Sequence, residues 1–157
     1  MKLEKKKLVI CIAIPLLVGL ISGLLTRGGM MSFATLNQPP LSPPAWLFPV
    51  MWTILYTLMG ISSYLILVSE GDSKERTDAL AVYFYQLVVN FLWPVFFFSF
   101  QWYLFAFIWL LFLWVLVAIM IWRFWSISKV AAYINIPYLI WLTFAAYLNF
   151  GVWWLNR

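Results

Sequence analysis

The stretch LNQPPLSPPAWLFPVMWTILYTLMGISSY, residues 36–64, decides how this chain is organised. Four of the six residues from 39 to 44 are prolines, and the apolar run that follows carries no charge. Proline fixes φ, lacks a backbone N–H and pushes the preceding residue out of the helical region. We therefore expect residues 36–44 to form a stiff, non-helical lid that ends where a membrane helix begins. A stiff lid over an aromatic helix favours a covered pocket for a flat, apolar ligand.

The composition is that of an integral membrane protein. Of the 157 residues, 66% are hydrophobic and 10% are charged, whereas soluble domains contain about 25% charged residues. Aromatic residues are also abundant, since they make up 21% of the chain and include 11 tryptophans. The net charge of +5 is no indication of nucleic-acid binding, because the basic residues flank the apolar segments, as membrane topology requires. The lipid bilayer is the partner that this composition predicts.

Several kinds of chemistry are disfavoured by what the sequence lacks. It contains no histidine and a single cysteine, Cys11, so we expect no disulfide framework, no metal site and no haem axial ligand. No Asp, Glu, Lys, Arg or His lies inside an expected span, which argues against an ion pump or a proton relay. No nucleophile–base pair is visible for hydrolysis. We therefore expect no bound cofactor.

Five segments are long and apolar enough to cross a membrane, which takes roughly 20 residues. The uncharged run 79–122 would be about 66 Å long as one helix, twice the hydrocarbon thickness, so it must contain two spans with a break near residues 99–101. The first apolar run could imitate a signal peptide, but it lacks a clear cleavage site and we expect a retained helix. Pro137 indicates a kink or an early helix position. The sequence thus predicts a single all-α transmembrane domain over 1–157, with helices at about 8–25, 45–68, 79–99, 102–122 and 130–154.

The distribution of basic residues predicts an orientation. Eight Lys and Arg residues fall on the side of the N-terminus, in the N-terminal tail and in the connections near residues 69–78 and 123–129. Only Arg27 and Arg157 fall on the opposite side. Because basic residues concentrate on the cytoplasmic side, we expect the N-terminus inside, and the C-terminus and the lid outside.

Three of the expected helices carry aromatic and polar side chains on one face. These are Trp52, Tyr56 and Gly60; Gln86, Asn90 and Trp93; and Tyr138, Trp141, Ala145 with Leu148 or Asn149. Amides at membrane depth need partners, and hydrogen bonding between helices is a more ordinary role for them than ligand contact. Tryptophans near helix ends are typical of the membrane interface. Gly19 and Gly23 form a small-xxx-small pair that favours close helix packing, within the bundle or between protomers.

These motifs resemble the TspO/MBR family, also called tryptophan-rich sensory proteins or translocator proteins. The resemblance rests on LNQPPLSPPAWLFPVMWTILYTLMG (36–60), QLVVNFLWPVFFF (86–98) and PYLIWLTFAAYLN (137–149), in this order. It implies a five-helix bundle, a homodimer, and a pocket beneath the first loop for tetrapyrroles such as protoporphyrin IX and for other flat hydrophobic molecules. The activities proposed for the family, and implied here by the resemblance, are transport, stress sensing, and light- and oxygen-dependent porphyrin degradation.

The resemblance also assigns residues by position. Trp52 and Trp141 correspond to pocket tryptophans implicated in porphyrin breakdown, so they would be the catalytic residues of an enzyme. The expected ligand-binding set is Trp52, Tyr56, Asn90, Trp93, Tyr138, Trp141, Ala145 and Leu148, and the lid prolines are Pro39, Pro43 and Pro44.

The chain departs from the family pattern in the lid and at the C-terminal end. The KPxWxPP pattern of many members is altered here, because Gln38 replaces the lysine and Leu41 the tryptophan. Ser32 stands where a second loop tryptophan is frequent. Phe150 replaces the tyrosine of the cholesterol-recognition pattern, so we do not expect sterol recognition.

Tetrapyrrole binding is the function that these features favour, because it needs only an aromatic apolar pocket. A porphyrin-degrading enzyme and a transporter of hydrophobic ligands are the alternatives, and both rest on the resemblance. The mixed loops favour a bacterial plasma membrane.

Overall fold

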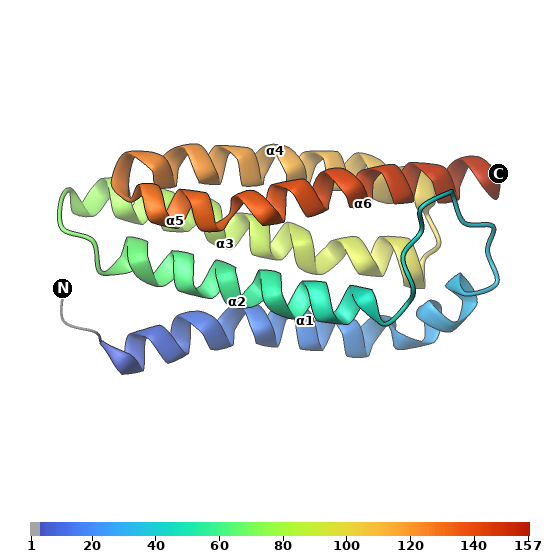
Figure 1. Ribbon diagram of the computed structural model, residues 1–157, viewed down its shortest axis with the longest axis horizontal. Coiled ribbons are helices and arrows are strands. Elements are labelled where there is room, and N and C mark those ends of the chain that lie inside the picture. The colour runs from blue at the N-terminus through green and yellow to red at the C-terminus, as the bar shows by residue number, and fades with distance from the viewer. Residues whose placement is uncertain (1–3) are drawn as a thin grey trace.

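The computed structural model describes residues 4–157, and over this range the chain is helical with no strand (Figure 1). Within these described residues, five helical stretches are long and apolar enough to cross a membrane, which confirms the all-α, five-span fold class. The elements in chain order are α1 (Lys5–Phe33), α2 (Leu47–Leu67), α3 (Ser73–Pro94), the short π-helix η1 (Val95–Ser99), α4 (Tyr103–Ile127), α5 (Lys129–Ile134) and α6 (Ile136–Leu155). The expected non-helical lid is the segment between α1 and α2.

Helices α1, α3 and α4 extend beyond the spans expected from the sequence, whereas α2 (Leu47–Leu67) is slightly shorter than the expected 45–68. Helix α1 runs from Lys5 to Phe33, although the apolar run predicted only 8–25, and Arg27 lies within it. Helix α3 begins at Ser73 rather than near residue 79, because the Asp72 side chain caps it by accepting a hydrogen bond from the Lys74 N–H at 2.9 Å. Apolar length measures the part of a helix that lies in hydrocarbon, whereas capping and proline decide where the helix ends.

The fifth expected span is divided into α5 and α6 at Asn135. Pro137 lies in the first turn of α6, where a missing N–H does no harm, so the early helix position is the correct one of the two roles predicted for it. The Asn135 side chain is fully buried and donates hydrogen bonds to the Ala131 carbonyl and to the Ser62 hydroxyl. This amide fastens the junction of α5 and α6 to α2.

A π-helical segment connects α3 to the turn before α4. Pro94 cannot donate to the carbonyl four residues earlier, and the next five residues wind as a π-helix. The Phe100 N–H closes the segment on the Val95 carbonyl at 3.0 Å, and Gln101 follows with a φ of 57°. The break expected at residues 99–101 is therefore present.

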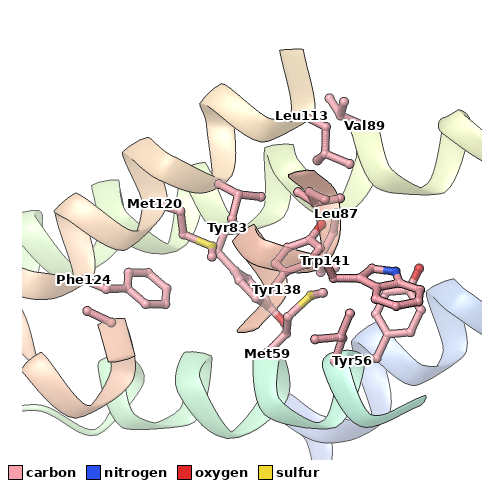
Figure 2. Packing of buried hydrophobic residues seen from close by; sticks show 14 of the residues in the cluster. Tyr56, Met59, Tyr83, Leu87, Val89, Leu113, Met120, Phe124, Tyr138 and Trp141 are labelled. Carbon is pink, nitrogen blue, oxygen red and sulfur yellow. The ribbon is translucent and has the colours of Figure 1, made fainter. Parts of the chain in front are cut away.

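The apolar core lies between α2, α3, α4, α5 and α6, from Phe124 at one end to Tyr56 and Trp141 at the other (Figure 2). Helix α1 contributes little to it, since only Pro15, Ser22 and Thr26 of its 29 residues are buried. Helix α1 nevertheless lies against α2, and its backbone comes so close that a Cβ at Gly60 would stand 2.4 Å from the Ile12 Cα. The first helix is therefore packed on the outside of the other helices.

The two ends of the bundle carry different elements (Figure 1). The beginning of α1, the α2–α3 connection and the α4–α5 connection lie at one end. The lid, the η1–α4 turn and the C-terminus lie at the other. We call this second end the lid end.

Candidate functional site

A cavity of about 820 Å³ lies at the lid end of the bundle, within the range of about 300–1,000 Å³ typical of small-molecule sites. Its walls come from α1, the lid, the start of α2, the end of α3 with η1, and the second half of α6. The residues that line it are Leu16, Gly19, Leu20, Ser22, Gly23, Leu24, Met30, Phe33, Ala34, Gln38, Ser42, Pro43, Ala45, Phe48, Pro49, Trp52, Thr53, Tyr56, Asn90, Trp93, Pro94, Phe97, Phe98, Ala145, Leu148, Asn149 and Val152. None of them is charged.

Two groups of aromatic rings line the cavity, one on α2 and one at the end of α3 and in η1. On α2, the ring of Trp52 lies 5.4 Å from that of Tyr56, centroid to centroid. At the end of α3, Trp93 stacks on Phe97 at 5.2 Å with 25° between the ring planes. Such faces suit a flat conjugated ligand, because aromatic rings attract one another in offset-stacked geometry.

A chain of hydrogen bonds begins at the cavity and runs into the core. The Tyr56 hydroxyl donates to the Asn90 Oδ1 at 2.7 Å, and the Asn90 amide donates to the Tyr138 hydroxyl at 2.6 Å. The Tyr138 hydroxyl in turn donates to the Gln86 Oε1 at 2.8 Å. All four side chains are buried, and together they join α2, α3 and α6. The interhelical bonding expected of the amides is therefore observed at Gln86 and Asn90.

Asn149 makes the third such contact. Its Oδ1 accepts a hydrogen bond from the Trp93 indole N–H at 3.0 Å, and its amide donates to the Tyr103 carbonyl at 2.8 Å. Trp93 is thereby held in one orientation against the cavity, and α6 is tied to α3 and α4.

The lid is fastened to α6 at three places. Asn37 and Asn156 form a reciprocal pair, in which the Asn37 N–H donates to the Asn156 Oδ1 at 3.0 Å and the Asn156 amide donates to the Asn37 carbonyl at 2.8 Å. The Tyr147 hydroxyl donates to the Pro40 carbonyl at 2.8 Å. Between these two contacts, a Cβ at Gly151 would stand 2.5 Å from the Pro39 ring, so only glycine lets the lid approach α6 this closely.

The tip of the lid is a tight turn. The Ser42 N–H donates to the Pro39 carbonyl at 3.3 Å, and Leu41 has a φ of 67°. A positive φ at the third position of a turn is usual for Gly or Asn and strained for leucine. The Leu41 side chain is 83% exposed, so it points away from the cavity.

Six of the eight expected ligand-binding residues line the cavity: Trp52, Tyr56, Asn90, Trp93, Ala145 and Leu148. Tyr138 lies deeper and reaches the cavity only through Asn90. Trp141 also lies outside the lining, and it packs edge-on against the cavity-lining Phe48 at 6.0 Å. Of the lid prolines, Pro43 lines the cavity, whereas Pro39 packs against α6 and Pro44 lies outside the lining.

Sequence reasoning missed the contribution of α1. The cavity is lined by Leu16, Gly19, Leu20, Ser22 and Gly23 of this helix. The glycine pair has two separate roles: Gly19 packs against the Tyr56 ring, where a Cβ would be 2.2 Å away, whereas a Cβ at Gly23 would meet no atom within 4 Å. The small residues on one face of α1 are the available indication in the sequence, but a small-xxx-small pair by itself predicts helix packing and not a cavity wall.

The cavity is closed on one side and open on the other. Its lining residues on α3 and α6 include the buried Asn90, Leu148 and Val152. Along α1, the lid and the start of α2, several lining residues are also exposed at the surface: Leu20, Leu24, Met30, Ala34, Gln38, Ala45, Pro49 and Thr53. An opening therefore runs along the seam between α1 and α2 and reaches the lid at Gln38.

The three separated motifs, the five spans and this covered cavity agree with the match of a family model, that of the TspO/MBR family, to residues 11–155. The chain belongs to the TspO/MBR family. It is 33% identical to the tryptophan-rich protein TspO of Chlorobaculum tepidum over 150 residues, which is 95% of each chain. It is 36% identical to the translocator protein of Bos taurus, over 92% of this chain and 86% of the relative. It is 37% identical to the tryptophan-rich sensory protein of Cereibacter sphaeroides, over 79% and 76% of the two chains.

The match includes every residue that lines the cavity of this TspO/MBR protein, from Leu16 to Val152. The cavity is thus part of the family region.

Proposed function

We propose that this TspO/MBR protein binds tetrapyrroles and other flat hydrophobic ligands in the cavity beneath the lid. The observation that carries the proposal is the cavity of about 820 Å³, whose aromatic lining includes Trp52 and Trp93. A conjugated macrocycle would stack on these rings, and the fixed hydrogen bonds of Tyr56 and Asn90 would keep its environment rigid.

The chemistry of the lining favours a metal-free ring over haem. Haem iron in proteins is held by His, Cys, Met or Tyr. The chain has no histidine, and Cys11 does not line the cavity. The hydroxyl of the lining Tyr56 donates to Asn90, which leaves Met30 as the lining side chain of a ligating type. Binding would therefore depend mainly on stacking and apolar contact.

The test is a titration of the purified protein in detergent with protoporphyrin IX, followed by quenching of tryptophan fluorescence. We expect Trp52→Phe and Trp93→Phe to weaken the affinity by about threefold each, because each replaces an indole by a smaller phenyl ring and loses part of a stacking contact of about 1 kcal/mol. Trp122→Phe is the matched control, since Trp122 is 70% exposed on α4 and lies outside the cavity. An affinity that is the same in all three variants and the wild type would remove the cavity as the binding site.

Light-driven porphyrin degradation is a second candidate, favoured by the position of Trp52. Its ring lines the cavity and lies 5.4 Å from Tyr56, so an oxidised tryptophan would have a second redox-active ring beside it. In this reading dioxygen is the oxidant. Under illumination with oxygen, porphyrin absorbance should fall faster with folded protein than with denatured protein, and Trp52→Phe should slow it more than Trp141→Phe. Equal decay with folded and denatured protein would exclude the activity.

For the orientation we propose that the N-terminus lies inside and that the lid and C-terminus lie outside. The argument is the excess of Lys and Arg in the N-terminal tail and in the connections near residues 69–78 and 123–129. The homodimer and the bacterial plasma membrane stay predictions, since the relatives come from bacteria and from a mammal alike.

A further inference from the structure

We infer that the cavity selects uncharged ligands, and that Gln38 at its mouth is a specificity-determining residue that leaves a ligand carboxylate without a cationic partner. This inference rests on the proposed function and narrows its ligand class to uncharged or esterified planar molecules.

The first observation is the chemistry of the lining. Its polar side chains are all neutral: Ser22, Gln38, Ser42, Thr53, Tyr56, Asn90 and Asn149. Several of them are already occupied by protein partners. Tyr56 and Asn90 bond to each other, and Asn149 holds Trp93 and the Tyr103 carbonyl. A carboxylate entering the cavity would therefore lose its hydration and find no compensating charge.

The second observation is the position of the cations at the lid end. Arg27 lies on the exposed face of α1 and does not line the cavity. The Arg157 guanidinium lies 3.5 Å from the centre of the Trp154 ring, so it is engaged beside α6. Neither cation lines the cavity.

The third observation is the mouth itself. Gln38 is exposed and also lines the cavity. A ligand stacked on Trp52 or Trp93 whose polar edge faces the seam and the lid would meet Gln38 and Thr53, the polar lining residues exposed there. The Thr53 hydroxyl already donates to the Pro49 carbonyl at 2.8 Å. The Gln38 amide accepts and donates hydrogen bonds but offers no charge to a carboxylate. The rest of the opening, along α1 and α2, is apolar apart from Thr53.

The experiment compares protoporphyrin IX with its dimethyl ester in the same detergent, by quenching of tryptophan fluorescence. We expect the wild type to bind the ester at least about tenfold more tightly, because an unpaired charge is costly in an apolar site. In Gln38→Lys, the affinity for the dicarboxylic acid should rise by about fivefold or more, and that for the ester should stay unchanged. The ratio between the two variants cancels any difference in partition of the two porphyrins into micelles.

Two control variants isolate the effect. Gln38→Met keeps the length of the side chain without a charge, so its affinity for the acid relative to the ester should stay as low as in the wild type. Thr35→Lys places the same charge on an exposed residue that does not line the cavity, and it should also leave the ratio unchanged. An unchanged ester affinity in each variant shows that the protein is folded.

The outcomes separate the two proposals. Quenching by neither porphyrin would refute the proposed function, and the inference with it. Binding of the acid as tightly as the ester by the wild type would overturn the inference and leave the proposed function standing. A preference for the ester that Gln38→Lys does not reduce would overturn the role of Gln38.

Discussion

The hydroxyl of Tyr138 accepts a hydrogen bond from Asn90 on α3 and donates one to Gln86 on the same helix. One phenol of α6 thus satisfies two buried amides, whose desolvation would otherwise oppose folding. Tyr133 is a contrasting residue, because its ring lies on α5 and is 55% exposed. The two tyrosines allow a matched comparison.

Tyr138→Phe should lower the free energy of unfolding by about 1 kcal/mol, since hydrogen bonds between membrane helices contribute about 0.6 kcal/mol each. Tyr133→Phe should change it by less than about 0.5 kcal/mol. Thermal unfolding in a single detergent would measure both changes. Equal shifts for the two variants would contradict the importance of the buried chain.

Glycines of α1 and α2 allow a second comparison at the residue scale. A Cβ at Gly60 would meet the backbone of α1 at Ile12 and Cys11, whereas one at Gly23 would enter the open cavity. Backbone cannot yield as a side chain can, so the two helices would have to separate.

Gly60→Ala should therefore destabilise the protein by about 1–3 kcal/mol, in the range typical of overpacking. Gly23→Ala should be neutral or slightly stabilising, because alanine favours the helix. Thermal unfolding of both variants, measured side by side, would check this. A loss of stability at Gly23 as large as that at Gly60 would contradict the open space beside Gly23.

At the scale of elements, the lid is held by contacts with α6 rather than by contacts with the cavity. Its hydrogen bonds run to Tyr147 and Asn156, and its close packing is with Gly151. A lid fastened in this way should govern how fast a ligand leaves more than how tightly the walls stack on it.

The double variant Tyr147→Phe/Asn156→Ala should raise the dissociation rate of bound protoporphyrin by roughly five- to tenfold, as expected for losing exposed hydrogen bonds of about 1 kcal/mol. Stopped-flow displacement would measure the rate. Tyr133→Phe, at the opposite end of the bundle, serves as the control. If the rate does not change in the double variant, the lid contacts do not limit release.

The elements also show what the sequence could and could not predict. Proline chemistry placed the lid, because φ and the missing N–H act locally and are independent of the rest of the fold. The packing of Trp141 against Phe48 was not predictable. The spacing along α6 predicts which of its residues share a face, but not which side chain of another helix covers that face. The role of Gly23 depends on a cavity between α1 and its neighbours, and such a cavity leaves no periodic pattern in one helix.

At the scale of the whole molecule, the five spans of residues 4–157 place the start of α1 and the C-terminus at opposite ends of the bundle (Figure 1). The proposed orientation then puts the lid, the cavity mouth and Gln38 on the outer side of the membrane. Ligands would meet the protein from that side or from the adjacent lipid leaflet.

Single cysteines in a Cys11→Ser background would test this orientation. Leu41→Cys at the exposed lid tip should react with a membrane-impermeant maleimide on intact cells. Ser73→Cys, in the α2–α3 region at the opposite end, should react only after lysis. The reverse pattern of labelling would place the lid inside the cell.

Few residues of α1 are buried, and this affects the range of ligands that the cavity can bind. The hydrogen-bonded chain Tyr56–Asn90–Tyr138–Gln86 joins α2, α3 and α6 and does not include α1. A ligand that pushes α1 outward would break no bond of that chain, although it would cost contacts such as the hydrogen bond from the Ser22 hydroxyl to the Phe91 carbonyl at 3.1 Å. We expect one cavity to accommodate molecules of different thickness, so that chemically unrelated compounds compete for the same place with similar affinity.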